Sequence, residues 1–96
     1  MQRDPYIPQL TFHAESRLAQ RRISPAAVDA VLSYGRCSYV RGAQVRAIGR
    51  REVVHFQKQG IDLRPFEGLQ VLLDTDGSHV LTAYRNHDFR GLKAIW

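Results

Sequence analysis

The spacing of hydrophobic residues changes near residue 37, and this change limits the folds open to the chain more than any other feature. Before it, apolar residues recur every three or four positions, as on a helix. After it, they mostly alternate with polar residues, as in half-buried strands. With 96 residues, the chain is expected to form one domain around one core. Helices followed by strands indicate an α+β domain.

Two helices are predicted in the first part of the chain. The first runs from an N-cap at Thr11 to about Arg22, and the second is "SPAAVDAVLSYG". Ser24 is a favourable N-cap for the second helix, and Pro25 suits its first position. Gly35 stands where a C′ glycine ends many helices. The buried stripes are expected at Phe12, Ala19 and Ile23 in the first helix and at Val28, Val31 and Leu32 in the second.

The rest of the chain predicts an antiparallel meander of four or five strands. Two short strands surround a turn at Gly42, and further strands are expected over 50–57, 69–74 and 79–85. The Asp-Gly pair in "TDGS" favours a hairpin between the last two. Residues 1–10 are expected to form an extended arm, because prolines disfavour helix before them. Residues 11–96 form the domain, and the tail either covers the core through Leu92, Ile95 and Trp96 or extends away from it.

The charge of the chain narrows the class of partner. Fourteen basic and nine acidic residues give a net charge of +5 and a pI near 10.0, and 12 of the 14 bases are arginine. Arginine matches phosphate geometry, so this balance favours a nucleic acid or an acidic protein as partner. A GC-rich genome, which favours arginine codons, is the alternative explanation of the arginine content.

Several classes of protein are not expected from this sequence. No apolar run is long enough for a membrane span, and the N-terminus lacks the apolar region of a secretory signal, so a cytoplasmic protein is expected. Cys37 is the single cysteine, which fits a reducing compartment. Neither a zinc-type Cys/His spacing nor a glycine-rich phosphate loop is present, so no metal or cofactor is expected.

Two groups of residues could carry chemistry. His13, Arg17 and Arg21 are spaced by four, which places them on one ridge of the first helix, where they can converge on one anion. In the last strand, Thr82 and Tyr84 share a face with Val80 and are expected to point outward, where their hydroxyls can contact a phosphate or ribose. The opposite face carries His79, Leu81, Ala83 and Arg85, with Leu81 and Ala83 in the core. The alternatives are a solvent-facing basic ridge and ordinary strand propensity.

A further basic ridge is expected on the sheet. If residues 50–57 form a strand, Arg51 and His55 lie on the same face as Val53. The alternative for His55 is a half-buried histidine with no functional role.

The order of these motifs resembles a known group of proteins. The pieces "FHAESRLAQRRIS", "GIDLRPFEG" and "DGSHVLTAYRN" together resemble a family of small bacterial domains placed near the BrnT- and RelE-type toxins. That family lies within the superfamily of barnase, EndoU, colicin ribonucleases and RelE. The resemblance extends from about Phe12 to Arg90.

The resemblance implies a RelE/barnase-like fold and metal-independent RNA cleavage. By this resemblance His13 transfers a proton, Arg17 and Arg21 neutralise the charge on phosphorus, and Thr82 or Tyr84 positions the nucleotide, while Arg85 is a further phosphate-binding candidate beside Arg51 and His55. RNA or the ribosome is the expected target, and an acidic antitoxin-like protein is the expected partner. Two alternatives stay open: a non-catalytic RNA- or ribosome-binding module, and a structural adaptor for a protein partner.

Overall fold

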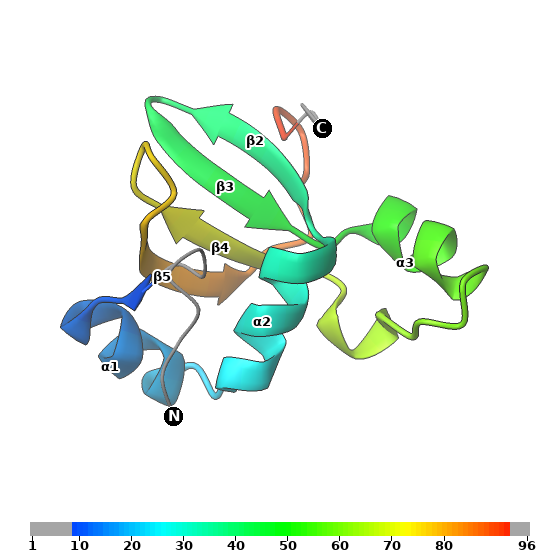
Figure 1. The fold of residues 1–96 in the computed structure, drawn as a ribbon, viewed down its shortest axis with the longest axis horizontal. Coiled ribbons are helices and arrows are strands. Elements are labelled where there is room, and N and C mark those ends of the chain that lie inside the picture. The colour runs from blue at the N-terminus through cyan, green and yellow to red at the C-terminus, as the bar shows by residue number, and fades with distance from the viewer. Residues whose placement is uncertain (1–8, 93–96) are drawn as a thin grey trace.

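A computed structural model describes residues 9–92 of the chain. It is an α+β fold with three α-helices and a sheet in which four strands are antiparallel (Figure 1). The helices are α1 (Phe12–Gln20), α2 (Pro25–Tyr34) and α3 (Arg50–Gln57). The strands are β1 (Gln9–Leu10), β2 (Arg36–Val40), β3 (Ala43–Ala47), β4 (Leu69–Leu73) and β5 (His79–Arg85), and a short 3-10 helix η1 covers Arg64–Phe66.

The two predicted helix starts are confirmed. The Thr11 hydroxyl accepts a hydrogen bond from the Ala14 N–H at 3.0 Å, and the Ser24 hydroxyl accepts one from the Ala27 N–H at 3.1 Å. Each satisfies a backbone donor that the first helical turn leaves free.

Gly35 does follow the second helix, but the reason for a glycine is different from the expected one. Its φ is −72°, outside the left-handed region of a C′ glycine. A Cβ at this position would lie 2.5 Å from the Val31 carbonyl oxygen and 2.9 Å from that of Ala47. The glycine is therefore required by the close approach of α2 to the end of β3.

The sheet has the strand order β1-β5-β4-β3-β2. Strands β2 to β5 form the predicted meander, while β1 pairs in parallel with the start of β5. The β2–β3 turn is made by Arg41 and Gly42, both with positive φ, as a two-residue hairpin turn requires. Because β1 is only two residues long, most of the outer edge of β5 has no strand beside it in the described part of the chain.

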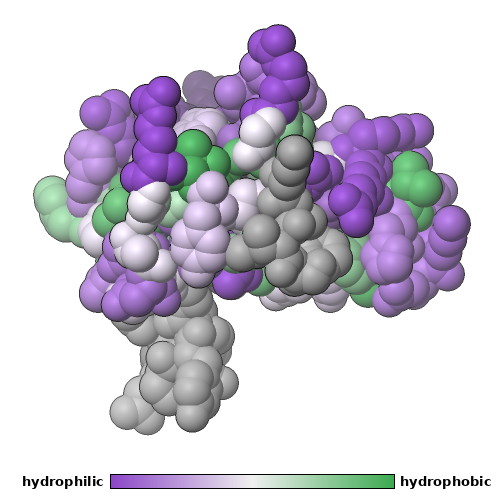
Figure 2. Space-filling model, turned by 90° about the horizontal axis from the view of Figure 1, so that it is seen from above, coloured by the Kyte–Doolittle hydropathy of each residue, from purple (hydrophilic) through white to green (hydrophobic). Residues whose placement is uncertain are grey.

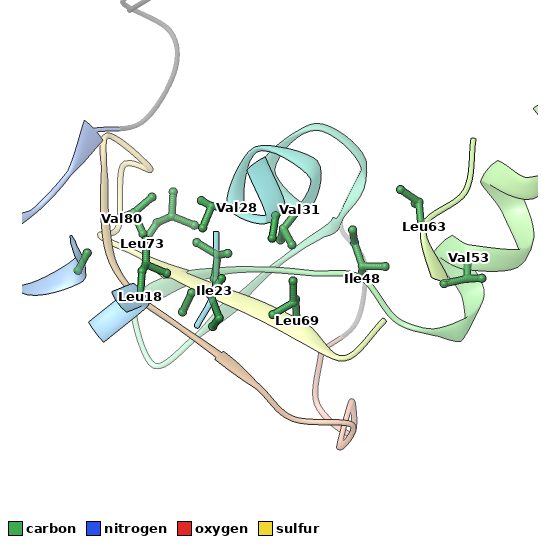
Figure 3. Packing of buried hydrophobic residues seen from close by; sticks show 14 residues of the cluster. Leu18, Ile23, Val28, Val31, Ile48, Val53, Leu63, Leu69, Leu73 and Val80 are labelled. Atoms are coloured by element: carbon green, nitrogen blue, oxygen red, sulfur yellow. The ribbon is translucent and has the colours of Figure 1, made fainter. Parts of the chain in front are cut away.

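The two faces of the sheet are covered by different segments. Helices α1 and α2 lie on one face (Figure 1) and share with it the main core, whose members include Leu18, Val31, Val71 and Val80 (Figure 3). On the other face, Leu92 packs with Val45 and Ala47. The prediction that the tail contributes to the core is thus confirmed for Leu92, while Ile95 and Trp96 lie outside the described residues.

The prediction of a strand over residues 50–57 is wrong, because this segment is helix α3. Glu52 and Val53 are adjacent in sequence and both buried. In a strand with a single buried face, only one of two adjacent side chains would be buried. Glu52 accepts from the Gly49 N–H at 2.8 Å and pairs with Arg36 at 2.9 Å. These contacts fix the first turn of α3 and override the strand preference of two valines and a phenylalanine.

None of the helices in the described range is long and apolar enough to span a membrane.

Candidate functional site

Helix α1 turns a different face toward the core than the sequence analysis expected. Phe12 is 86% exposed and Ala19 is exposed, so the predicted stripe through Phe12, Ala19 and Ile23 is wrong except at Ile23. The buried residues of α1 are Ala14 and Leu18, four apart. His13, Arg17 and Arg21 each precede or follow this pair by one position or three, so their ridge flanks the buried stripe. The basic ridge therefore lies where α1 meets the sheet.

His13 and Arg17 are in direct contact on this ridge. The Arg17 Nε–H donates to His13 Nε2 at 3.2 Å, and both side chains reach solvent. Because a guanidinium can only donate, His13 Nε2 must be the acceptor, and the neutral ring then carries its proton on Nδ1. The contact therefore assigns the histidine tautomer.

Arg21 connects the ridge to the last strand. Its Nη1 donates to the Thr82 hydroxyl at 3.1 Å and to the Ala83 carbonyl at 2.8 Å. These bonds lie on the edge of β5 opposite β4, beyond the part that β1 covers, where no strand of residues 9–92 pairs with β5, so Arg21 also satisfies an edge carbonyl. Arg21 thus joins the end of α1 to β5, about sixty residues away in sequence. We call the surface formed by α1 and this part of β5 the α1–β5 surface.

Strand β5 does not alternate as expected. Leu72 pairs with Thr82 but Leu73 pairs with Val80, so Leu81 is an extra residue in a β-bulge. Val80 and Ala83 are therefore both fully buried, whereas Leu81 is only partly buried, and its assignment to the core is wrong. The bulge shifts the alternation by one residue.

Thr82 and Tyr84 are both half-buried and lie on the face of β5 away from α1 and α2. Burial raises the pKa of the Tyr84 hydroxyl, and the Arg21 charge opposes this shift without cancelling it. The phenol is therefore protonated at neutral pH and can donate a hydrogen bond.

The other predicted binding residues lie elsewhere. Arg51 and His55 are exposed on α3, at the opposite end of the molecule from α1 (Figure 1). The ring of His55 packs edge-on against Phe56, with centroids 4.9 Å apart. Arg85 is exposed as the last residue of β5. Of the eight predicted residues, five therefore lie along the α1–β5 surface: His13, Arg17, Arg21, Thr82 and Tyr84.

Arg22, predicted as the approximate end of the first helix, has an unusual backbone conformation that was not predicted. It follows Arg21, is exposed, and has φ of 55°, in the left-handed region. The Ile23 N–H donates to the Leu18 carbonyl at 2.9 Å, which makes Arg22 the C′ residue of α1, a position where glycine is favoured. The break of the helical pattern at "RRIS" is the only sequence signal for this conformation.

Large hydrophobic side chains are exposed at Phe12, Tyr39 and Val54, on three different elements. Figure 2 likewise shows hydrophobic surface only in separate areas of the face in view, with hydrophilic surface around them. Scattered apolar residues of this kind need no partner to explain them. They give no support to a broad apolar docking surface on that face.

Among residues 9–92, no three His, Cys, Asp or Glu side chains are placed so that they could hold a metal ion. Comparison with protein-family models, with curated proteins and with solved structures finds no match to this chain.

Proposed function

We propose that the protein binds RNA at the α1–β5 surface and cleaves its backbone as a toxin-type, metal-independent ribonuclease. The observation that carries this proposal is the hydrogen bond between Arg21 and Thr82, because it joins the basic ridge of α1 to a hydroxyl group of β5. The Arg21 guanidinium and the Thr82 hydroxyl thus meet at the open edge of β5, and the Tyr84 hydroxyl lies on the same face of the strand as Thr82. That set of donors suits a phosphodiester.

Arg17 and Arg21 hold the phosphate in this proposal. When the phosphate binds the Arg17 guanidinium, the hydrogen bond from Arg17 to His13 Nε2 breaks. The free nitrogen then accepts the proton of the RNA 2′-hydroxyl, whose oxygen attacks the adjacent phosphorus. The two guanidiniums stabilise the negative charge that develops there.

Tyr84 is the proposed proton donor to the leaving group. The bond between phosphorus and the 5′-oxygen breaks, and that oxygen takes a proton from the Tyr84 hydroxyl, whose raised pKa keeps it protonated. The products are a 2′,3′-cyclic phosphate and a free 5′-hydroxyl. Thr82, already bonded to Arg21, orients that guanidinium.

The experiment is RNA cleavage by purified protein in the presence of a chelator, comparing the wild type with His13→Ala and Tyr84→Phe. We expect His13→Ala to lower the rate at least about a hundredfold, as for loss of a general base, with little change in RNA affinity. Equal rates for the wild type and His13→Ala would contradict the catalytic assignment. Growth arrest on induced expression, relieved by His13→Ala, is the matching test in cells and addresses the toxin assignment.

A non-catalytic RNA- or ribosome-binding module is the second candidate. It is favoured by the exposure of the His13–Arg17 pair, because electrostatic catalysis is most effective where water is excluded. It predicts RNA affinity with a steep salt dependence and no cleavage, on free RNA or on ribosomes. An acidic antitoxin-like partner would compete for the same surface under either candidate, since both rely on its positive charge.

A further inference from the structure

A basic hollow lies on a different part of the molecule from the α1–β5 surface. It has a volume of about 270 Å³ and is formed by the start of α3, the residues before β4 and the segment that follows β5. Its lining includes Arg50, Arg51, Glu67 and His87. The hollow is therefore built from elements that the proposed function does not use.

Three arginines around the hollow face two carboxylates, so positive charge is in excess there. Arg36, which also lines it, is fully paired with Glu52 and contributes no net charge. Arg50 is 77% exposed and only loosely paired with Glu67, at 3.8 Å. Arg51 makes no side-chain hydrogen bond or ion pair with any other residue of the described range. Arg50 and Arg51 thus have only the Glu67 carboxylate near them, and the unpaired guanidinium of Arg51 favours an added anion.

Two glycines fix the walls of the hollow. A Cβ on Gly49 would lie 2.8 Å from the Phe89 ring, and a Cβ on Gly68 would lie 2.6 Å from the His87 ring. Both aromatic rings therefore pack directly against backbone, and Gly68 also has φ of +91°. The position of His87 at this hollow is thus set by the backbone of the residue that precedes β4.

One residue that lines the hollow, His87, is close in sequence to the α1–β5 surface. His87 follows Tyr84 by three residues, so their Cα atoms are at most about 11 Å apart. Successive phosphates of a nucleic acid strand advance by roughly 3.4 Å along the helix axis. The guanidinium groups of the two places lie farther apart than these two Cα atoms, because α3 is at the opposite end of the molecule from α1 (Figure 1), so one RNA strand must have several nucleotides to reach both.

We infer that this hollow is a second phosphate subsite for the same RNA strand, with Arg50 and Arg51 as its phosphate ligands. The inference rests on the proposed function and extends it to an RNA strand long enough to contact both places. Once an RNA strand is bound at one subsite, its binding at the other is intramolecular. Affinity for RNA therefore rises sharply when the strand is long enough to span both subsites.

The test is the affinity of 2′-O-methyl RNA, which cannot be cleaved, measured by fluorescence anisotropy with a dinucleotide and an octanucleotide. We expect the wild type to bind the octanucleotide at least about tenfold more tightly than the dinucleotide. The variant R50A/R51A should lose this gain and keep the dinucleotide affinity. The control R41A/K58A removes two exposed positive charges from other places and should keep the gain. Thermal melting of each variant confirms that it is folded.

The inference would be overturned if R50A/R51A bound the octanucleotide as tightly as R41A/K58A does. The variant R17A/R21A separates this result from a failure of the proposed function. If R17A/R21A weakens binding and R50A/R51A does not, the hollow is excluded and the α1–β5 surface is retained. If only R50A/R51A weakens binding, the hollow is retained and the α1–β5 surface is excluded. A wild type that binds neither RNA overturns both.

Discussion

Arg21 and Thr82 are 61 residues apart in sequence, yet the Arg21 guanidinium donates to the Thr82 hydroxyl at 3.1 Å. The same nitrogen donates to the Ala83 carbonyl at 2.8 Å, on the open edge of β5. This contact positions the end of α1 on the last strand. It also brings one basic residue of the ridge to a hydroxyl group of β5.

Arg21→Ala should therefore lower stability as well as RNA affinity. Loss of hydrogen bonds from a charged group to a partly buried acceptor is expected to cost about 1–2 kcal/mol. Thr82→Val should cost less, because the bond to Ala83 remains, and Thr82→Ser should be close to the wild type. Urea unfolding of the three variants and of R21A/T82V measures the coupling between the two residues. Additive effects in the double variant would show that the contact contributes nothing.

Arg22→Gly should raise stability. Arg22 has φ of 55°, a conformation that costs a residue with a Cβ about 1 kcal/mol relative to glycine. Arg22→Ala is the matched control, because it removes the same charge and keeps the strain. We expect the midpoint of urea unfolding to rise for Arg22→Gly alone. A rise of equal size for both variants would attribute the effect to charge.

Glu52→Ala should be the most destabilising of these changes. Glu52 is 1% exposed and its carboxylate holds the Arg36 guanidinium, which also donates to the Leu92 carbonyl and lies 4.9 Å from the centre of the Phe89 ring. Removing the carboxylate leaves a buried cation without its partner, at an expected cost of about 3–5 kcal/mol. Replacing both residues, as R36M/E52L, should cost less than E52A alone. Thermal or urea unfolding measures both, and a cost for E52A below about 1 kcal/mol would contradict the assignment.

Stability should fall as the pH is lowered from about 4 toward 2. The His79 backbone N–H, and then its side chain, hold the pKa of Asp74 at about 2, and Arg90 holds the pKa of Asp88 at about 2. Both values lie below the ordinary value of about 3.9, so the native state favours the ionised form and this contribution is lost as the pH falls through the native pKa. Asp74→Asn should therefore show a weaker pH dependence in this window than the wild type. An unchanged pH dependence would contradict the role of Asp74.

The sequence was sufficient to predict those parts of the fold that depend on local chemistry. The caps at Thr11 and Ser24 and the turn at Gly42 follow from side-chain hydrogen bonds and backbone preferences within a few residues. The α1–β5 surface could be proposed because the spacing of four along α1 and the alternation near Thr82 and Tyr84 are both local patterns. Their contact through Arg21 was not predictable, because it depends on how α1 folds back along the edge of β5.

The incorrect predictions concern segments whose structure depends on packing against residues distant in sequence. Helix α3 is fixed by the pairing of Glu52 with Arg36, whereas its own residues favour a strand. The spacing of Glu52, Val53 and Phe56 was the available helical signal. The buried stripe of α1 consists of Ala14 and Leu18, whose spacing of four is helical, whereas side-chain size alone favours Phe12. The bulge at Leu81 has no local signature, since it comes from the register between β4 and β5.

The central claim is that Arg17 and Arg21 bind the RNA backbone at the edge of β5. The most direct measurement is the affinity of a single-stranded, non-cleavable RNA over a range of salt concentrations, for R17A/R21A and for R64A/R90A. The second variant removes two exposed arginines that are paired with Asp62 and Asp88, and so matches the change in charge. We expect R17A/R21A alone to weaken binding at every salt concentration and to reduce the slope of log K against log salt by about 1.4, as for two lost phosphate contacts. Equal affinities and slopes for the two variants would contradict the claim.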